Sequence, residues 1–241
     1  MKNMFGKMVL ACAAITLGLC GQANAGAITV NNHSFESPAS TTVIAVPDSW
    51  TVDVARAYNP YVFNGNNNFY NGANSISDPA NGGSGYPGID GENVATVFQA
   101  AAGTGLSQTL SAVLTANTSY TLTVAVGHRD GTAGAITLGS KIALLAGTTV
   151  IASATEDSSP LGFHDQTATL ADSSAFSSLY GQALSIRIET TLPWTVTFQA
   201  TDWDNVRLDA TAVPEPSSLA LAGLGALGLF AWRSKRRKVV A

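Results

Sequence analysis

The chain has 241 residues, of which 46% are hydrophobic and 12% charged, and its formal net charge is −4. Seven of the twelve Lys and Arg lie outside residues 26–213, so this segment holds five basic and fifteen acidic side chains, a net charge of −10. Such a segment has no basic surface to neutralise phosphates, which excludes nucleic-acid binding and disfavours anionic membranes. Cys12 and Cys20 both precede it, so disulfides and cysteine-ligated metal sites are excluded as well.

The N-terminus has the three parts of a signal peptide. These are the cations Lys2 and Lys7, the apolar run Val9–Leu19, and the small residues Ala23 and Ala25 of a cleavage site. We therefore expect residues 1–25 to be removed and the mature chain to begin at Gly26. Lipidation at Cys20 is the alternative, which bulky Leu19 directly before it disfavours.

The segment 26–212 is predicted to be a single all-β domain. Alternating apolar and polar residues predict strands at Asn93–Phe98, Tyr120–Val126, Lys141–Leu145, Leu184–Glu189 and Val206–Leu208. Turn residues at 116–118, 146–147, 159–160 and 180–181 separate them. No run with a sustained period of 3.6 apolar residues interrupts the pattern. Short strands, many turns and one core predict a β-sandwich.

A series of short motifs in this domain is similar to a known group of sandwiches. The motifs are Asn32–Pro38, Trp50–Val52, Gly91–Ala95, Leu106–Leu110, Asn117–Val124 and Asp204–Leu208. Their order resembles the galactose-binding-like jelly rolls found among bacterial carbohydrate-binding modules. The resemblance covers most of residues 28–209 and implies a jelly-roll β-sandwich; the Asn- and Gly-rich stretch 57–85 departs from it.

The resemblance also implies a structural metal. In similar modules an early Phe-Glu pair and an Asp of the last strand meet around Ca²⁺, and Glu36 and Asp204 match these positions. Calcium takes six to eight oxygen ligands, so backbone carbonyls would complete such a site. Pairing of Glu36 with an arginine, or capping of a strand end, is the alternative.

The stretch 58–71 is the most unusual in the domain. It places aromatic rings among amides, and both features suit sugars, because rings cover apolar faces and amides bind hydroxyls. The candidate ligand-binding residues are Tyr58, Tyr61, Asn66, Asn68 and Tyr70. The alternative is that the rings belong to the core and the asparagines form turns.

Catalysis finds little support in the sequence. His33, His128 and His164 lack metal-ligand spacing, and no Gly-x-Ser-x-Gly motif is present. His164 and Asp165 are adjacent, and adjacent residues of a strand face opposite sides. The carboxylate pairs Glu156/Asp157 and Asp202/Asp204 are interpreted as ordinary acidic surface. We therefore predict that the protein is not an enzyme.

The C-terminal segment 213–241 has three parts. Pro214-Glu215-Pro216 is followed by an apolar helix at 217–232 and a basic tail at 233–238. This arrangement resembles the PEP-CTERM sorting signal that exosortases recognise in Gram-negative bacteria. The apolar run would be only about 24 Å long as a helix, which is short for a permanent anchor. A lasting C-terminal membrane helix is the alternative.

Together these features predict an exported protein held transiently in the inner membrane and then placed at the cell surface or in the extracellular matrix. We expect a non-catalytic module that binds extracellular polysaccharide. One alternative is a structural or adhesive protein that acts through protein–protein contacts, and a weaker one is an enzyme similar to glycoside hydrolases.

Overall fold

A computed structural model describes residues 25–37, 46–53, 61–64, 90–91, 93–98, 101–128, 139–157, 162–191 and 200–213. Residues Ala25–Thr211 form one compact unit. Among its described residues, eleven strands make up nearly all of the regular structure. In the part of the chain that the structure describes, no helix has the length and apolar character needed to cross a membrane.

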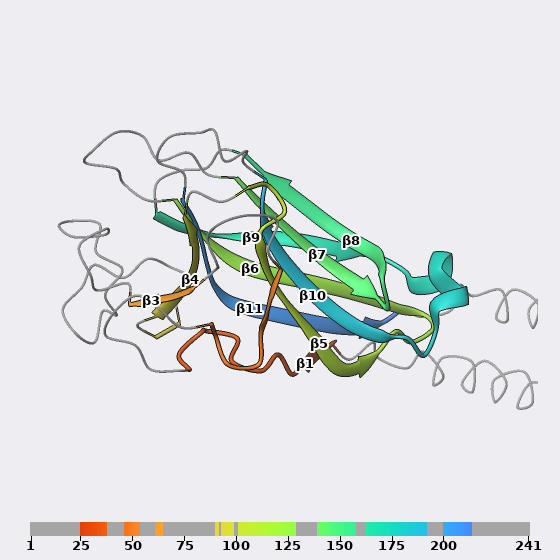
Figure 1. Cartoon of the computed structure of the whole chain (residues 1–241). Coiled ribbons are helices and arrows are strands. Elements are labelled where there is room, and N and C mark those ends of the chain that lie inside the picture. The colour runs from red at the N-terminus through yellow and green to blue at the C-terminus, as the bar shows by residue number, and fades with distance from the viewer. Residues whose placement is uncertain are drawn as a thin grey trace, which may run out of the picture. The chain divides into compact units, whose positions relative to one another are not determined.

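The strands form two antiparallel sheets that pack face to face (Figure 1). Sheet A has the order β3-β4-β11-β6-β9, with β1 also paired to β11. Its strands are β1 (Ala25–Ile28), β3 (Tyr61–Asn64), β4 (Asn93–Phe98), β6 (Thr118–His128), β9 (Gly162–Leu170) and β11 (Ala200–Ala212). Sheet B has the order β2-β5-β10-β7-β8. Its strands are β2 (Thr51–Asp53), β5 (Gly105–Val113), β7 (Ser140–Ala146), β8 (Thr149–Glu156) and β10 (Ala183–Thr190).

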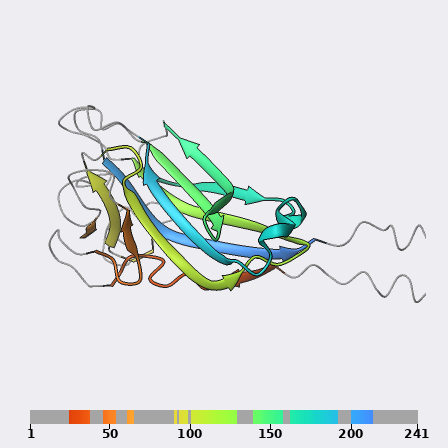
Figure 2. The same cartoon turned by 45° about the vertical axis from the view of Figure 1, so that its right-hand side comes forward.

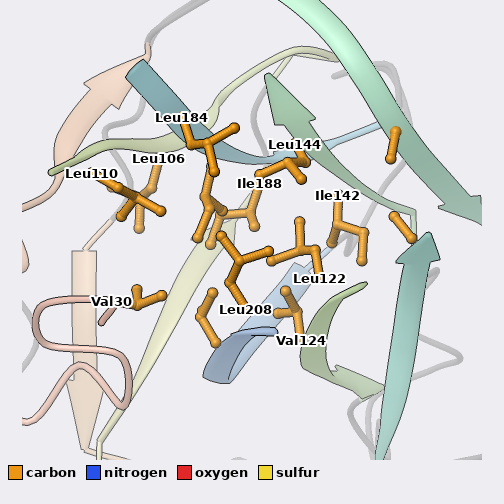
Figure 3. Packing of buried hydrophobic residues seen from close by; sticks show 14 of the residues in the cluster. Val30, Leu106, Leu110, Leu122, Val124, Ile142, Leu144, Leu184, Ile188 and Leu208 are labelled. Atoms are coloured by element: carbon orange, nitrogen blue, oxygen red, sulfur yellow. The ribbon is translucent and has the colours of Figure 1, made fainter. Parts of the chain in front are cut away.

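The core lies between the two sheets. Alternation along each strand places Leu122 and Val124 of β6 opposite Leu144 and Ile188 of sheet B, and all four are fully buried. Figure 3 shows these side chains pointing toward one another from the two sheets. Trp203 of β11 is the largest fully buried side chain among the described residues, and its ring nitrogen donates to Ser140 Oγ. Apolar side chains are thus removed from water without leaving the indole N–H unpaired.

β11 organises sheet A because two strands share one of its edges. β4 pairs with Ala200–Trp203, and β1 pairs with Leu208–Thr211. Between these two stretches, Asn205 has a positive φ of 45°, and Val206 N–H donates to the carbonyl of His33. The segment that follows β1 is therefore held against the middle of β11, where Asp204 lies.

The structure confirms the predicted β-sandwich and each of the five predicted strands, most of which extend further than their predicted ranges. Seven elements were not predicted individually: the strands β1, β2, β3, β5, β8 and β9 and the 3₁₀ helix η2 (Ser173–Leu179). Figure 2 shows η2 where the chain crosses from β9 in sheet A to β10 in sheet B. Asp172 caps this helix at its N-terminus. The helix has only 7 residues, which are too few to show an apolar period in the sequence.

Candidate functional site

One half of the outer face of sheet A is buried although it lies outside the core. Six buried residues make up what we call the outer patch: Val94, Thr96, Ala125, Gly127, Phe163 and Asp202. None of them belongs to the hydrophobic cluster between the sheets. The strand registers place Asp202 opposite Thr96, and Gly127 opposite Phe163. The patch therefore spans four neighbouring strands, β4, β11, β6 and β9.

The other half of this face is a normal solvated surface. Arg207 of β11 and Asp165 of β9 form an ion pair there, and their side chains are 41% and 45% exposed. Thr167 and Thr169 of β9 are exposed beside them. Because the same sheet face changes from exposed polar residues to buried small and apolar ones, the outer patch is a separate environment and not a continuation of the surface.

Asp202 gives the outer patch its chemistry. Its exposure is 0%, and its strand neighbours Trp203 and Thr201 point the other way, into the core. A carboxyl group on an enclosed, mostly apolar face can give or take a proton from a bound molecule without competition from water. The interpretation of Asp202 and Asp204 as ordinary acidic surface is therefore wrong, since both are fully buried.

A second acidic group lies at the start of β4. We call Glu36, Asp90 and Asp204, with the neighbouring His33 and Asn93, the acidic rim. Asp90 N–H donates to Asp204 Oδ2 over 2.8 Å, and Asn93 N–H donates to Glu36 Oε1 over 2.7 Å. His33 Nε2 lies 3.0 Å from Asp90 Oδ2. Glu36 and Asp204 thus lie close to each other, and each accepts a hydrogen bond from a backbone N–H, that of Asn93 or of Asp90.

Burial dominates the electrostatics of Asp204. Its removal from water raises the pKa well above the ordinary value of 3.8, and the carboxylates of Asp90 and Glu36 raise it further. The backbone N–H groups of Asp90 and Asn205 donate to the carboxylate and oppose the shift without cancelling it. The environment of this carboxyl group therefore favours its protonated form or a cation beside it.

Local backbone geometry holds Glu36 in the rim. The Asn32 side chain donates to the carbonyls of Ser37 and Asp48 and accepts from Ser37 N–H, which closes the turn at 32–37. The Glu36 carboxylate then lies against Gly91, where a Cβ atom would be 2.4 Å from Oε1. Gly91 also has a φ of +93°, so only glycine suits this position.

The rim suits a hard cation better than a transition metal. Asn93 Oδ1 is buried and has no hydrogen-bond partner among the described residues, and the backbone N–H of the same residue donates to Glu36. Oxygen atoms of this kind are what calcium binds. Within the described residues, however, no three His, Cys, Asp or Glu side chains converge closely enough to hold a metal by themselves. A calcium ion here would depend on amide or backbone oxygens as well.

Other candidate residues are placed differently. Tyr58, Asn66, Asn68 and Tyr70 lie outside the described residues, and Tyr61 begins β3. The sorting residues Pro214, Glu215 and Pro216 and the cleavage-site residue Ala23 also lie outside them, whereas Ala25 begins β1 opposite Thr211.

The adjacent residues His164 and Asp165 do not form a dyad. His164 Nε2 lies 2.7 Å from Glu156 Oε2, whereas Asp165 pairs with Arg207 on the other face of the sheet. His164 and Glu156 join β9 of sheet A to β8 of sheet B, and their side chains are only 27% and 24% exposed. This contact connects the two sheets at their edge.

A surface groove adjoins the acidic rim. It has a volume of about 410 Å³ and lies between the N-terminal segment and β11, lined by Ala27–Val30, His33 and Val206–Asp209. Its single carboxylate, Asp209, is exposed. The groove therefore lacks the enclosed acid that distinguishes the outer patch.

Comparison with known proteins identifies the family. The model of the HpiC1-like family, described as HpiC1 cyclase, matches residues 26–209. The chain belongs to this family of HpiC1-like cyclases. A crystal structure of a Stig cyclase from Fischerella sp. TAU, in complex with (3Z)-3-(1-methyl-2-pyrrolidinylidene)-3H-indole, is 29% identical with a TM-score of 0.61. The match covers 79% of this chain and 100% of that one.

Two further structures of a cyclase from Fischerella sp. TAU are each 31% identical. The first has a TM-score of 0.61 and covers 79% of this chain and 99% of the other. The second, in complex with 4-(1H-indol-3-yl)butan-2-one, has a TM-score of 0.60 and covers 78% and 98%. No curated protein matches the chain significantly.

Membership of the HpiC1-like family corrects the functional prediction. The sequence predicted a non-catalytic, polysaccharide-binding module, and the family match shows that this prediction is wrong. The prediction that the protein is not an enzyme is wrong for the same reason. The physical reason is that alternating strands specify a sandwich, and the same sandwich serves binding modules and enzymes. The resemblance to jelly-roll modules is confirmed for the fold, but it did not distinguish these two uses.

The C-terminal resemblance is confirmed directly. Residues 212–237 match the PEP-CTERM protein-sorting motif. The HpiC1-like domain of this chain is therefore followed almost immediately by a sorting tail.

Proposed function

We propose that the protein is an exported cyclase that closes a ring within an apolar, indole-type substrate bound at the outer patch. The observation that supports this is the family match over residues 26–209, together with identities of 29–31% to cyclases that bind indole compounds. The outer patch supplies a suitable environment, because it combines one buried carboxyl with an aromatic ring and small residues.

Each part of the patch has a role in such a reaction. Asp202 protonates the substrate or removes a proton from it, and the enclosed face excludes the water that would intercept a cationic intermediate. The ring of Phe163 stabilises positive charge that develops near its face. Ala125 adds only a methyl group to the face of β6 between the Phe163 ring and Asp202.

Turnover of a defined compound tests this function. Ring closure within one molecule is an isomerisation, so the product of an indole carrying an alkene side chain keeps its mass and loses the alkene. We expect the full-length chain, purified in detergent, to convert such compounds, with mass spectrometry and NMR as readouts. If no indole is converted and 4-(1H-indol-3-yl)butan-2-one does not bind, the proposal is wrong.

We also propose that the acidic rim holds a structural calcium ion through Glu36 and Asp204, with Asn93 Oδ1 as a further oxygen. Among the described residues, the fully buried Asp204 carboxyl has two acidic neighbours, Asp90 and Glu36, and no contact with an arginine or lysine. A divalent cation would neutralise this group and stabilise the turn that carries Glu36.

Calcium removal should lower thermal stability. At a calcium concentration of about 100 times Kd, the ion would contribute roughly 2.7 kcal/mol, or about 5–10 °C in Tm for a domain of this size. We expect EDTA to remove this increment from the wild type but not from Glu36→Gln or Asp204→Asn, with the exposed Asp209→Asn as matched control. An EDTA-insensitive Tm in the wild type would exclude the ion.

The contributions of Asp204 and of calcium to the stability of the fold should depend on pH in a defined direction. Because burial raises the pKa of Asp204, the folded protein binds a proton that the unfolded chain releases above about 3.8. In EDTA, this contribution to stability is complete at low pH and is lost as the pH rises through the raised pKa. Calcium binds the ionised form, so its stabilising effect should grow over the same interval.

We infer that an exosortase processes the PEP-CTERM tail after export, in the inner membrane of a Gram-negative bacterium. The motif supports this, since residues 212–237 combine the Pro-Glu-Pro sequence with an apolar run and a basic tail. Replacement of Pro214 and Pro216 by Ala should leave the tail uncleaved, which immunoblotting of membrane and extracellular fractions would detect. Identical processing of this variant and the wild type would contradict the inference.

A further inference from the structure

The segment of β11 that carries Asp202 is hydrogen-bonded to the facing sheet. The two residues beside Asp202, Thr201 and Trp203, both point away from the outer patch and into the interior. Thr201 Oγ1 donates to the carbonyl of Gly139 over 2.9 Å, and Trp203 Nε1 donates to Ser140 Oγ over 3.0 Å. Ser140 is the first residue of β7 in sheet B, and Gly139 directly precedes it. Two bonds therefore join β11 to one short segment of sheet B, one on each side of Asp202.

Ser140 also connects to β9, a second strand of the outer patch. Ser140 Oγ donates to Gln166 Oε1 over 2.8 Å, and Gln166 Nε2 donates to the Ser140 carbonyl over 3.4 Å. Gln166 belongs to β9, which carries Phe163 of the outer patch. One hydroxyl group thus links, from the interior, the two strands that carry Phe163 and Asp202 on their outer faces. β6 lies between these two strands in sheet A.

The hydrogen bonds of this network are shielded from water. The side chains of Ser140, Gln166, Thr201 and Trp203 are all 5% exposed or less. The carbonyl of Gly139 also accepts from Thr191 N–H over 3.2 Å, so both of its lone pairs are used. Hydrogen bonds are stronger in the interior than in water, and each one fixes a direction as well as a distance. A buried network of this kind specifies one arrangement of the strands that it joins.

We propose that Ser140, acting through Trp203, and Thr201 are positioning residues that hold Asp202 in place in the outer patch. This inference rests on the proposed cyclase function and adds the residues that orient its proton-transferring group. Proton transfer requires hydrogen-bond distance, and a displacement of about 1 Å can lower a rate by about a hundredfold. Loss of either bond to sheet B lets this part of β11 shift, and Asp202 shifts with it. Substrate binding uses the whole outer patch and changes less.

Turnover and binding, measured separately on the full-length chain, test these roles. Ser140→Ala removes the hydroxyl group and should lower kcat by roughly ten- to hundredfold. Thr201→Val removes the other bond, while the Gly139 carbonyl keeps the N–H of Thr191, and kcat should fall in the same way. KM and the calorimetric Kd of 4-(1H-indol-3-yl)butan-2-one should stay within about twofold of the wild type, because no residue of the outer patch is replaced. Ser140→Cys keeps a weaker hydrogen-bonding atom and should have a kcat between those of the wild type and Ser140→Ala.

Ser173→Ala is the matched control, because it removes the same group from a different part of the fold. Ser173 is 0% exposed, as Ser140 is, and its Oγ accepts from Thr118 N–H over 3.2 Å and donates to the carbonyl of Thr115 over 2.7 Å. Thr118 begins β6, and Ala125 of the outer patch follows roughly 23 Å further along this strand. Both changes leave buried polar groups unpaired, so Tm should fall by about 3–8 °C in each variant. Only Ser140→Ala should lose turnover.

A double variant shows whether Ser140 acts through the indole of Trp203. Trp203→Phe keeps an aromatic ring but removes the N–H that Ser140 accepts, so it should lower kcat by itself. In this background Ser140→Ala should lower kcat by less than about twofold more, a non-additivity expected of residues in contact. Two effects that add in full would show that Ser140 does not act through Trp203. Circular dichroism establishes that each variant is folded, and Thr201→Val and Ser140→Cys provide the test if Ser140→Ala is not.

The outcomes separate the two proposals. If the wild type converts an indole and the Ser140 and Thr201 variants keep its kcat, the positioning role is overturned while the cyclase function stands. Equal losses of kcat in Ser140→Ala and Ser173→Ala also overturn it, since reduced stability would then explain both. If the wild type binds and converts no indole, the proposed function fails and the positioning role fails with it. A lower kcat in Ser140→Ala and Thr201→Val, with KM unchanged and Ser173→Ala fully active, supports the inference.

Discussion

Asp202→Asn should abolish most of the turnover while the protein remains folded. The amide has nearly the same shape as the carboxyl group but cannot transfer a proton, so we expect kcat to fall by roughly 10²- to 10⁴-fold. Binding of 4-(1H-indol-3-yl)butan-2-one should change by less than about twofold, because the volume of the outer patch is preserved. Initial rates of isomerisation and calorimetric binding measure the two quantities separately.

Asp209→Asn is the matched control for this change. Asp209 lies on the same strand and on the same face, but it is exposed and belongs to the groove next to β1. Its replacement should leave both quantities unchanged. Retention of wild-type turnover by Asp202→Asn would show that another group carries the proton and would remove Asp202 from the proposed mechanism.

Gly105→Ala should strongly destabilise the fold. A Cβ atom at this position would lie 1.8 Å from the carbonyl oxygen of Ile188, and 2.7 Å from Glu189 Cα. Both contacts are with the backbone of β10, which pairs with β5 and also with β7. Because this central strand cannot move without breaking its other ladder, we expect a loss of about 3 kcal/mol or more in the free energy of unfolding. Tm should fall by roughly 6–12 °C.

Gly26→Ala is the corresponding control. Gly26 lies in β1, is paired with Ala210, and has no atom within 4 Å of the place where its Cβ would be. Its replacement should leave Tm within about 1 °C of the wild type, since surface substitutions of this kind cost less than about 0.5 kcal/mol. Equal unfolding midpoints for Gly105→Ala and the wild type would mean that β5 and β10 are not paired in this register.

Much of the sandwich could be predicted because apolar residues at alternate positions of a strand indicate which of its faces is buried. Tyr120–Val126 and Leu184–Glu189 alternate cleanly, and both are central strands with one face on the core. β9 alternates less clearly, because Phe163 and Gln166 are both buried, on opposite faces of the strand. A period-2 pattern presumes one solvated face, and it weakens where the outer face is buried as well.

The acidic rim was predicted in part. Glu36 and Asp204 were chosen from a resemblance, and in the structure they accept hydrogen bonds from the backbone of Asn93 and Asp90. Asp90 and Asn93 were not chosen, since neither belongs to a recognisable ligand motif. The hydrogen bond between Asp90 and Asp204 joins residues 114 positions apart, a contact that no local pattern can indicate.

The sequence by itself determined that this is an all-β domain without cysteines, preceded by a signal-like segment and followed by a PEP-CTERM tail. These properties depend on composition and on short-range periodicity, which are local. Only the tertiary structure decided that Asp202 and Asp204 are buried and that Phe163 lies across Gly127. Burial of a carboxyl group depends on which strands become neighbours and on what covers their outer face. Both depend on long-range packing. They decide whether a carboxyl group lies on an acidic surface or in a candidate active site.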